Sequence, residues 1–168
     1  EEVVEYKNHY KTIPDADNAI LGLYGSFMKL AEQVVVLNEL RGDLIDVTEN
    51  SSIDLQEINS NRPSPTNKYV DKTLFYNIIQ NCNDILVNLD KMKEKNVLTD
   101  GQYNERFSDV GALRCWTYLQ MGIQFGKVIY ITDPLVDIEE VNQNNSQPPI
   151  EFDELLKRLI ACMETLPT

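Results

Sequence analysis

The chain has 168 residues, of which 15 are Lys or Arg and 27 are Asp or Glu, so its formal net charge is −12. This length allows one domain whose core needs neither disulfide bonds nor metal. So acidic a chain argues against nucleic acid as a partner, because binding to phosphate depends mainly on Lys and Arg, and it equally disfavours an anionic lipid surface.

The first third of the chain predicts one long helix, over residues 15–36. Its apolar residues recur at steps of four and three, which places them on one helical face: Ala16, Ile20, Leu23, Phe27, Leu30 and Val34. A shorter helix is predicted over residues 37–47, and the polar stretch 49–68 is typical of a long loop. No uninterrupted apolar run reaches 18 residues, so no transmembrane helix is predicted.

Two further long helices are predicted over residues 69–95 and 102–129. The turn between them is short, which makes the two helices antiparallel neighbours. The second half of the later helix is apolar on nearly every side, and this indicates that it is the most buried helix.

A last helix follows a second polar connector, residues 137–149. Its apolar face is made by Phe152, Leu155, Leu159 and Met163. The only candidate strand is residues 128–131, which is short. The pattern therefore predicts an all-α fold, built from antiparallel helical hairpins of tetratricopeptide-like type with long polar loops. We interpret both chain ends as cuts in a longer α-solenoid, which predicts that the last helix keeps an exposed apolar face and self-associates.

Residues for catalysis or metal binding are scarce. The single histidine is His9, and the chain has neither a Gly-x-Ser-x-Gly motif nor a phosphate-binding glycine loop. Cys82, Cys115 and Cys162 lack the spacing of a zinc motif, and their apolar settings predict buried free thiols. Paired carboxylates that hydrolyse glycosides stay open as an alternative, since Asp and Glu are abundant. We predict no cofactor, no metal and no enzymatic activity.

Arg114 lies in the apolar stretch of the third long helix, where an unpaired cation is costly. Glu39, Asp43 and Asp84 are candidate partners. We expect Arg114 to be buried and to form a structural ion pair with Glu39 or Asp43, which would tie the second helix to the central one. Trp116 has a setting typical of the core, and the alternative is a platform on which a sugar stacks.

Five stretches of the chain, taken in order, carry a family resemblance. The first two are Tyr10-x-Thr12-x-x-Asp15-Ala16-x-x-Ala19-Ile20-x-Gly22-x-Tyr24 and Asn38-Glu39-Leu40-Arg41-Gly42-Asp43. The third is Tyr76-x-x-Ile79-x-x-Cys82-Asn83-x-x-Leu86, and the fourth is Ala112-Leu113-Arg114-Cys115-Trp116-x-Tyr118-Leu119 followed by Phe125-Gly126-x-Val128 and Thr132-x-Pro134. The fifth is Phe152-x-x-Leu155-x-x-x-Leu159-x-x-x-Met163-x-x-Leu166-Pro167. Together they span nearly the whole chain and resemble the N-terminal region of the SusD/RagB family.

The resemblance implies a single SusD-like N-terminal helical domain over residues 1–168, as a fragment of a longer protein. Members of this family are lipoproteins on the surface of the outer membrane of Gram-negative bacteria. They bind oligosaccharides or peptides, act with a TonB-dependent (SusC-like) transporter, and are not enzymes. The resemblance thus implies a non-catalytic nutrient-binding component of a glycan uptake system, whose lipid anchor is absent from this chain.

Sugar contacts vary between members of the family, so the candidate ligand residues come from loop composition alone. Neutral sugars need aromatic faces and hydrogen bonds from amides or guanidinium groups, and the polar loop concentrates Asn59, Asn61, Arg62, Asn67 and Tyr69. A mobile loop that binds no ligand is the alternative. Two other functions stay open, namely a generic tetratricopeptide-like protein-interaction module and, less favoured, a glycan-degrading enzyme.

Overall fold

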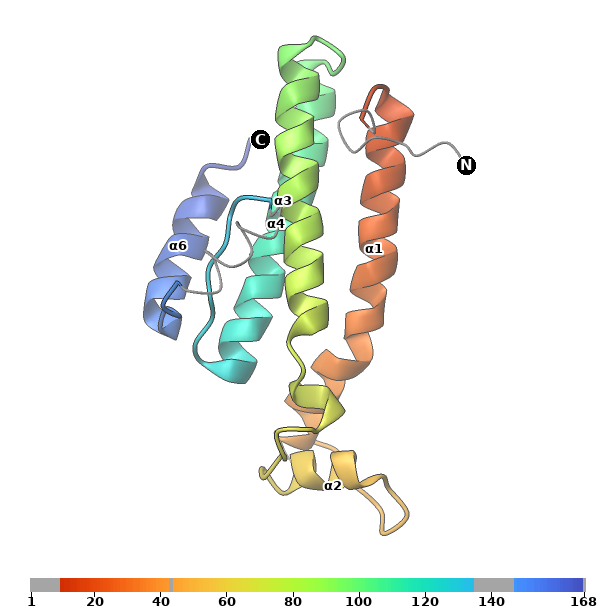
Figure 1. Ribbon diagram of the computed structural model, residues 1–168, viewed down its shortest axis with the longest axis vertical. Coiled ribbons are helices and arrows are strands. Elements are labelled where there is room, and N and C mark those ends of the chain that lie inside the picture. The colour runs from red at the N-terminus through yellow and green to blue at the C-terminus, as the bar shows by residue number, and fades with distance from the viewer. Residues whose placement is uncertain (1–9, 43, 135–146, 168) are drawn as a thin grey trace.

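The computed structural model describes residues 10–42, 44–134 and 147–167. Four long helices lie side by side in the order α1, α3, α4, α6, and the short helix α2 lies at one end of the bundle (Figure 1). The elements are α1 (Ile13–Val35), the π-helical turn η2 (Val36–Leu40), α2 (Ile53–Asn59), the 3-10 turn η3 (Lys68–Val70), α3 (Thr73–Glu94), α4 (Asp100–Phe125) and α6 (Phe152–Glu164). The prediction of an all-α fold is confirmed.

The helices begin and end at residues with a clear local cause. A capping box of Thr12 and Asp15 starts α1, and Thr99 with Gln102 does the same for α4. Gly126 ends α4 with a positive φ of 75°, a conformation that glycine adopts without strain.

By length and composition, residues Ile13–Leu40 make a helix that could cross a membrane, with a mean hydropathy of 1.4 in their most apolar window. This differs from the prediction, because Lys29 and Glu32 interrupt the apolar run, yet the mean hydropathy over the window stays high enough for a membrane span. Membrane spans and core helices share these properties. In this fold α1 packs on α3 through buried residues that include Leu23 and Leu30, while Leu21 and Met28 are exposed.

The most enclosed helix is α3, where α4 was expected. Like α4, which lies between α3 and α6, it has a neighbouring helix on two sides, namely α1 and α4 (Figure 1). The difference is in burial, because α3 buries nine of its 22 residues and α4 eight of its 26. The buried residues of α3 are Phe75, Ile78, Ile79, Cys82, Asn83, Ile85, Leu86, Leu89 and Met92. By contrast, α4 exposes Trp116 and Ile123 to solvent.

Two short elements differ from the sequence prediction. The helix expected over residues 37–47 is a π-helical continuation of α1 that ends at Leu40. The stretch predicted as a loop contains α2, because Ser52 caps its first turn and accepts a hydrogen bond from the Leu55 amide. Ile58 of α2 then packs on Leu37 and Leu40 in a small separate core.

The interface between α4 and α6 is close because a glycine lies in it. A Cβ atom added at Gly122 would lie 2.5 Å from Phe152 and 2.7 Å from Leu155. Leu155 and Leu159 are buried there and Phe152 is half-buried, so the apolar face expected to stay exposed on the last helix is mostly covered by α4.

Hydrogen bonds hold the segment that follows α4, residues 127–134, against the helical bundle. Val128 forms an antiparallel bridge with Ile150. The Tyr118 hydroxyl donates to the Ile131 carbonyl at 2.8 Å and accepts from the Ile131 amide at 2.7 Å. Asn83 donates to the same carbonyl at 3.1 Å. These contacts explain why a stretch without regular structure keeps one path against α3 and α4.

Candidate ligand-binding site

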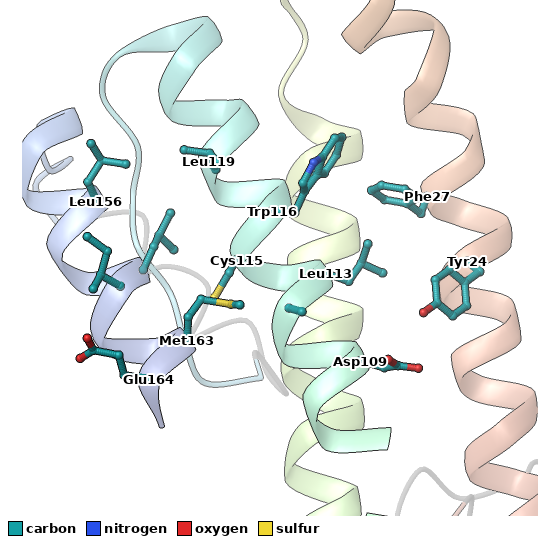
Figure 2. A pocket seen from close by; sticks show the side chains of 13 residues that line it. Tyr24, Phe27, Asp109, Leu113, Cys115, Trp116, Leu119, Leu156, Met163 and Glu164 are labelled. Atoms are coloured by element: carbon teal, nitrogen blue, oxygen red, sulfur yellow. The ribbon is translucent and has the colours of Figure 1, made fainter. Parts of the chain in front are cut away.

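A broad groove of about 880 Å³ lies over α4, between α1 and α6 (Figure 2). Three helices contribute to it, with α4 as the floor and the other two as walls. Its lining is almost entirely apolar, with two carboxylates: Tyr24, Phe27, Asp109, Ala112, Leu113, Cys115, Trp116, Leu119, Leu156, Leu159, Ile160, Met163 and Glu164.

Trp116 is a surface residue of this groove, so the prediction that it belongs to the core is wrong. It is 37% exposed and packs edge-on against Phe27 of α1, with ring centroids 4.9 Å apart and an interplanar angle of 71°. Figure 2 shows the two rings reaching toward each other across the groove. Because this part of α4 is apolar on nearly every side, its sequence does not reveal which face lies open.

The chemistry of the groove suits an apolar protein surface better than a neutral sugar. Its polar side-chain groups are the carboxylates Asp109 and Glu164, the Tyr24 hydroxyl, the Trp116 indole N–H and the Cys115 thiol. Burial, and then the nearby Asp109, raise the pKa of Tyr24, so this hydroxyl stays protonated and able to donate. A bound sugar would need more hydrogen-bonding partners than these.

A smaller cleft of about 330 Å³ lies where η2, α2 and the C-terminal end of α4 meet, and it combines polar and apolar groups. Arg41 donates to the Gln124 side-chain oxygen at 3.0 Å, and the Gln124 amide donates to Asn38. Asn61 borders the same cleft. Its apolar lining is Leu37, Ile58, Pro63, Val70 and Phe125. The cleft thus offers an amide and a guanidinium group beside an apolar wall.

Of the five loop residues predicted to bind ligand, Asn61 is the one that lines this cleft. It is exposed and has a left-handed backbone with φ 55°. Arg62 follows it and is also exposed. Asn59 is half-buried and donates to the Asp46 carboxylate at 2.8 Å.

The other two predicted residues, Asn67 and Tyr69, are buried and hold the loop in place. The Asn67 amide donates to the Asp54 carbonyl and to the Glu57 carboxylate, each at 2.9 Å. The Tyr69 hydroxyl donates to Glu32 at 2.9 Å and, with Lys68, lowers the pKa of that carboxylate. A sequence pattern does not separate polar residues that satisfy a turn from polar residues that face solvent.

Glu57 is the main acceptor inside this loop, and its contacts predict a pH dependence. Hydrogen bonds from Asn67 and then from Ser64 lower the pKa of Glu57. A lowered pKa means that the carboxylate supports the loop above its ordinary pKa, and that this support is lost as the pH falls through the lowered value. We expect the Ser64 amide, which donates to Glu57 at 2.9 Å, to exchange with solvent faster as the pH is lowered from 6 to 3, after correction for intrinsic exchange.

The Glu57→Gln variant serves as the control for this prediction. It keeps the shape of the side chain and removes its charge, so the Ser64 amide should exchange fast at pH 6 already and show little further change on acidification. Equal pH profiles for the variant and the unmodified chain would contradict the role of Glu57.

Arg114 does not form the predicted ion pair with Glu39. It is half-buried and its guanidinium group donates to the Asn83 side-chain oxygen at 2.8 Å and to the Cys162 sulfur at 3.6 Å. The second predicted partner, Asp43, lies outside the described residues. A third hydrogen bond goes to the Thr132 carbonyl at 3.5 Å. A neutral amide, a backbone carbonyl and a thiol, rather than a carboxylate, therefore receive this cation's hydrogen bonds.

The reason is the position of η2 along α4. Arg114 precedes Gln124 by ten residues, which corresponds to about 15 Å along a helix, and η2 lies beside the Gln124 end. A side-chain hydrogen bond does connect the end of η2 to α4, but it joins Arg41 to Gln124. In the part of the chain that the structure describes, no three His, Cys, Asp or Glu residues are placed to hold a metal ion.

Comparisons with known proteins identify the fold. No protein-family model and no curated protein matches the sequence. Among solved structures, NanU of B. fragilis is similar with a TM-score of 0.76 over 96% of this chain, at 18% sequence identity. The chain spans 31% of the length of NanU. Since NanU is a SusD-like protein, the chain has a SusD-like fold, and at the level of fold the family resemblance is confirmed.

Proposed function

We propose that this chain belongs to a non-catalytic glycan-binding component of a nutrient uptake system. The observation that carries the proposal is the SusD-like arrangement of its helices over 96% of the chain. The five stretches of sequence that resemble the SusD/RagB family support it. The partners proposed are an oligosaccharide or peptide nutrient and a TonB-dependent, SusC-like transporter. The location proposed is the outer surface of the outer membrane, through a lipid anchor.

The polar cleft between η2, α2 and α4 is the site we propose for the sugar. Sugar hydroxyls both donate and accept hydrogen bonds, and Asn61 offers an amide that does the same. Arg41 adds donors at fixed positions, because Gln124 holds its guanidinium group at 3.0 Å. The apolar wall at Pro63 and Phe125 provides a surface for the C–H face of a sugar ring.

An amide deletion at Asn61 tests this site. We expect Asn61→Gly to weaken binding of the preferred oligosaccharide about tenfold, because one lost hydrogen bond costs about 1–1.5 kcal/mol. Glycine is chosen because it keeps the left-handed backbone of this position without strain. Isothermal titration calorimetry with a panel of neutral oligosaccharides measures the effect.

Asn96 provides a matched control. It also has a left-handed backbone, with φ 56°, but lies in the turn between α3 and α4, far from the cleft (Figure 1). Asn96→Gly should leave oligosaccharide binding unchanged. Equal losses in the two variants, or no loss in either, would rule out the cleft as the site.

The same titrations separate the competing functions. A glycan-degrading enzyme would release new reducing ends from the oligosaccharide during incubation, whereas a binding protein returns it intact. A protein-interaction module would bind none of the sugars in the panel.

A further inference from the structure

The groove over α4 leaves an apolar surface open to solvent in the part of the chain that the structure describes. Trp116 is partly exposed in its floor, and Ile160 and Met163 of α6 are exposed along one wall. On the other wall, Tyr24 of α1 lines the groove, and Leu21, one turn before it, is exposed. A contiguous apolar surface of this kind typically marks a site where another protein binds.

The dimensions of the groove match a single α-helix. Its lining runs along α4 from Asp109 to Leu119, a stretch that corresponds to about 15 Å of helix. A partner helix of about three turns has this length, and its residues at i, i+4 and i+7 would face α4. The walls α1 and α6 would then contact its flanks, as neighbouring helices do in a bundle.

Both carboxylates of the groove lie at the same end of it. Figure 2 shows Asp109 of α4 and Glu164 of α6 at this end, with Trp116 and Leu119 farther along α4. Within the described residues, neither carboxylate forms an ion pair with a lysine or an arginine. The groove therefore has an apolar length and one negatively charged end.

A smaller cleft of about 260 Å³ adds to the charge at this end, because it shares Asp109 with the groove. Its other charged residues are Asp17, Glu105 and Arg106. Arg106 is already paired, since its Nε lies 2.7 Å from the Asp17 carboxylate. Together with Glu164, four carboxylates and one arginine line this end, so a net negative charge is left for a basic partner to neutralise.

We propose that the groove binds a basic amphipathic helix of a partner protein, with the apolar face of that helix on Trp116 and its Lys or Arg side chains at Asp109 and Glu164. Apolar burial supplies the binding energy, and the charged end fixes the direction in which the helix lies. The proposal does not rest on glycan binding, whose proposed cleft lies at the C-terminal end of α4 beside η2 and α2.

A second copy of the chain is the competing occupant, as the self-association expected from the last helix implies. Each copy has a net charge of −12, so two copies repel each other. A basic helix instead gains binding energy from the same charge. The charge of the groove therefore favours a basic partner over a second copy.

Trp116 makes the proposal directly measurable, because it is the only tryptophan of the chain. The probe is a tryptophan-free peptide of about 14 residues, with leucines on one helical face and lysines at one end of that face. We expect its binding to exclude water from Trp116, which shifts the fluorescence emission to shorter wavelengths in a saturable titration. The same peptide with glutamate in place of lysine should bind about tenfold more weakly, and high salt should reduce this difference.

Variants locate the peptide on the groove. Ile160→Ser removes an exposed apolar side chain from the α6 wall and should weaken binding of the lysine peptide about tenfold. Ile53→Ser is the matched control and should leave binding unchanged, because Ile53 is also exposed but belongs to α2 at the end of the bundle (Figure 1). Asp109→Asn and Glu164→Gln should each weaken binding of the lysine peptide about threefold, without weakening that of the glutamate peptide.

The proposal is overturned if the Trp116 emission does not change, if the two peptides bind equally well, or if Ile160→Ser and Ile53→Ser have equal effects. Sedimentation equilibrium of the chain alone tests the second copy. A dimer that dissociates in Ile160→Ser would show that a second copy occupies the groove. Loss of peptide binding when the chain is part of a longer SusD-like protein would show that the same protein covers the groove, and would also overturn the proposal.

Discussion

Replacing Leu155 with alanine should lower the free energy of unfolding by about 2–5 kcal/mol, which is typical of a large apolar side chain removed from a tight interface. Leu155 is completely buried between α6 and α4. The residue opposite is Gly122, where an added Cβ would lie 2.7 Å from the Leu155 side chain. Because a glycine has no side chain that could move into the space, the cavity left by the truncation stays largely unfilled.

Ile160 on the same helix is the matched control, since 58% of it is exposed. Ile160→Ala should change the free energy of unfolding by no more than about 0.5 kcal/mol. Urea denaturation followed by circular dichroism at 222 nm measures both variants. Similar losses for Leu155→Ala and Ile160→Ala would mean that α6 does not pack on α4 through this face.

The long helices were predictable because a period of 3.6 residues is a local property of the sequence. The expected helix over residues 15–36 is α1, and the last helix has its apolar residues where the pattern places them. What the pattern did not reveal is how much of each face is covered. The apolar face of α6 was expected to stay partly exposed, yet Leu155 and Leu159 are buried against α4, since Gly122 lets the two helices approach closely.

Trp116 is the opposite case, because it was expected to be buried and is partly exposed. This part of α4 is apolar on nearly every side, so the sequence indicates burial. Covering requires a partner helix on each face, and α1 meets Trp116 at an edge-to-face contact with Phe27 that leaves 37% of the tryptophan exposed. Which face of an apolar helix remains a groove is decided by the arrangement of its neighbours.

The candidate site was predicted only in part, because polar residues serve two purposes that composition does not separate. Asn61 is exposed at a cleft, whereas Asn67 is buried and satisfies the backbone of its own loop. The expected partner of Arg114 was a carboxylate, and the structure supplies Asn83 instead. Burial of a cation indicates that some acceptor is present, but it does not indicate which acceptor.

The polar cluster around Asn83 gives the second large effect that we expect. Replacing Asn83 with leucine should lower the free energy of unfolding by about 2–3 kcal/mol, because buried hydrogen-bonding groups lose their partner while the shape of the side chain is roughly kept. Asn83 is completely buried. Its amide donates to the carbonyls of Ile131 and Asp133 at 3.1 and 3.3 Å, and its oxygen accepts from Arg114 at 2.8 Å.

Asn83→Leu should loosen the segment over residues 127–134 in addition to lowering the free energy of unfolding. This local effect distinguishes a broken hydrogen-bond network from a general weakening of the core. The Ile131 carbonyl keeps its hydrogen bond from Tyr118, so the segment over residues 127–134 should loosen rather than detach. Its amides should exchange with solvent faster in Asn83→Leu, while the buried amides of α3 follow the global stability.

Asn81, exposed on the same helix, is the control, and Asn81→Leu should stay within about 0.5 kcal/mol of the unmodified chain. If Asn83→Leu unfolds at the same urea concentration as Asn81→Leu, the cluster contributes nothing to stability and the packing of α3 alone positions the segment.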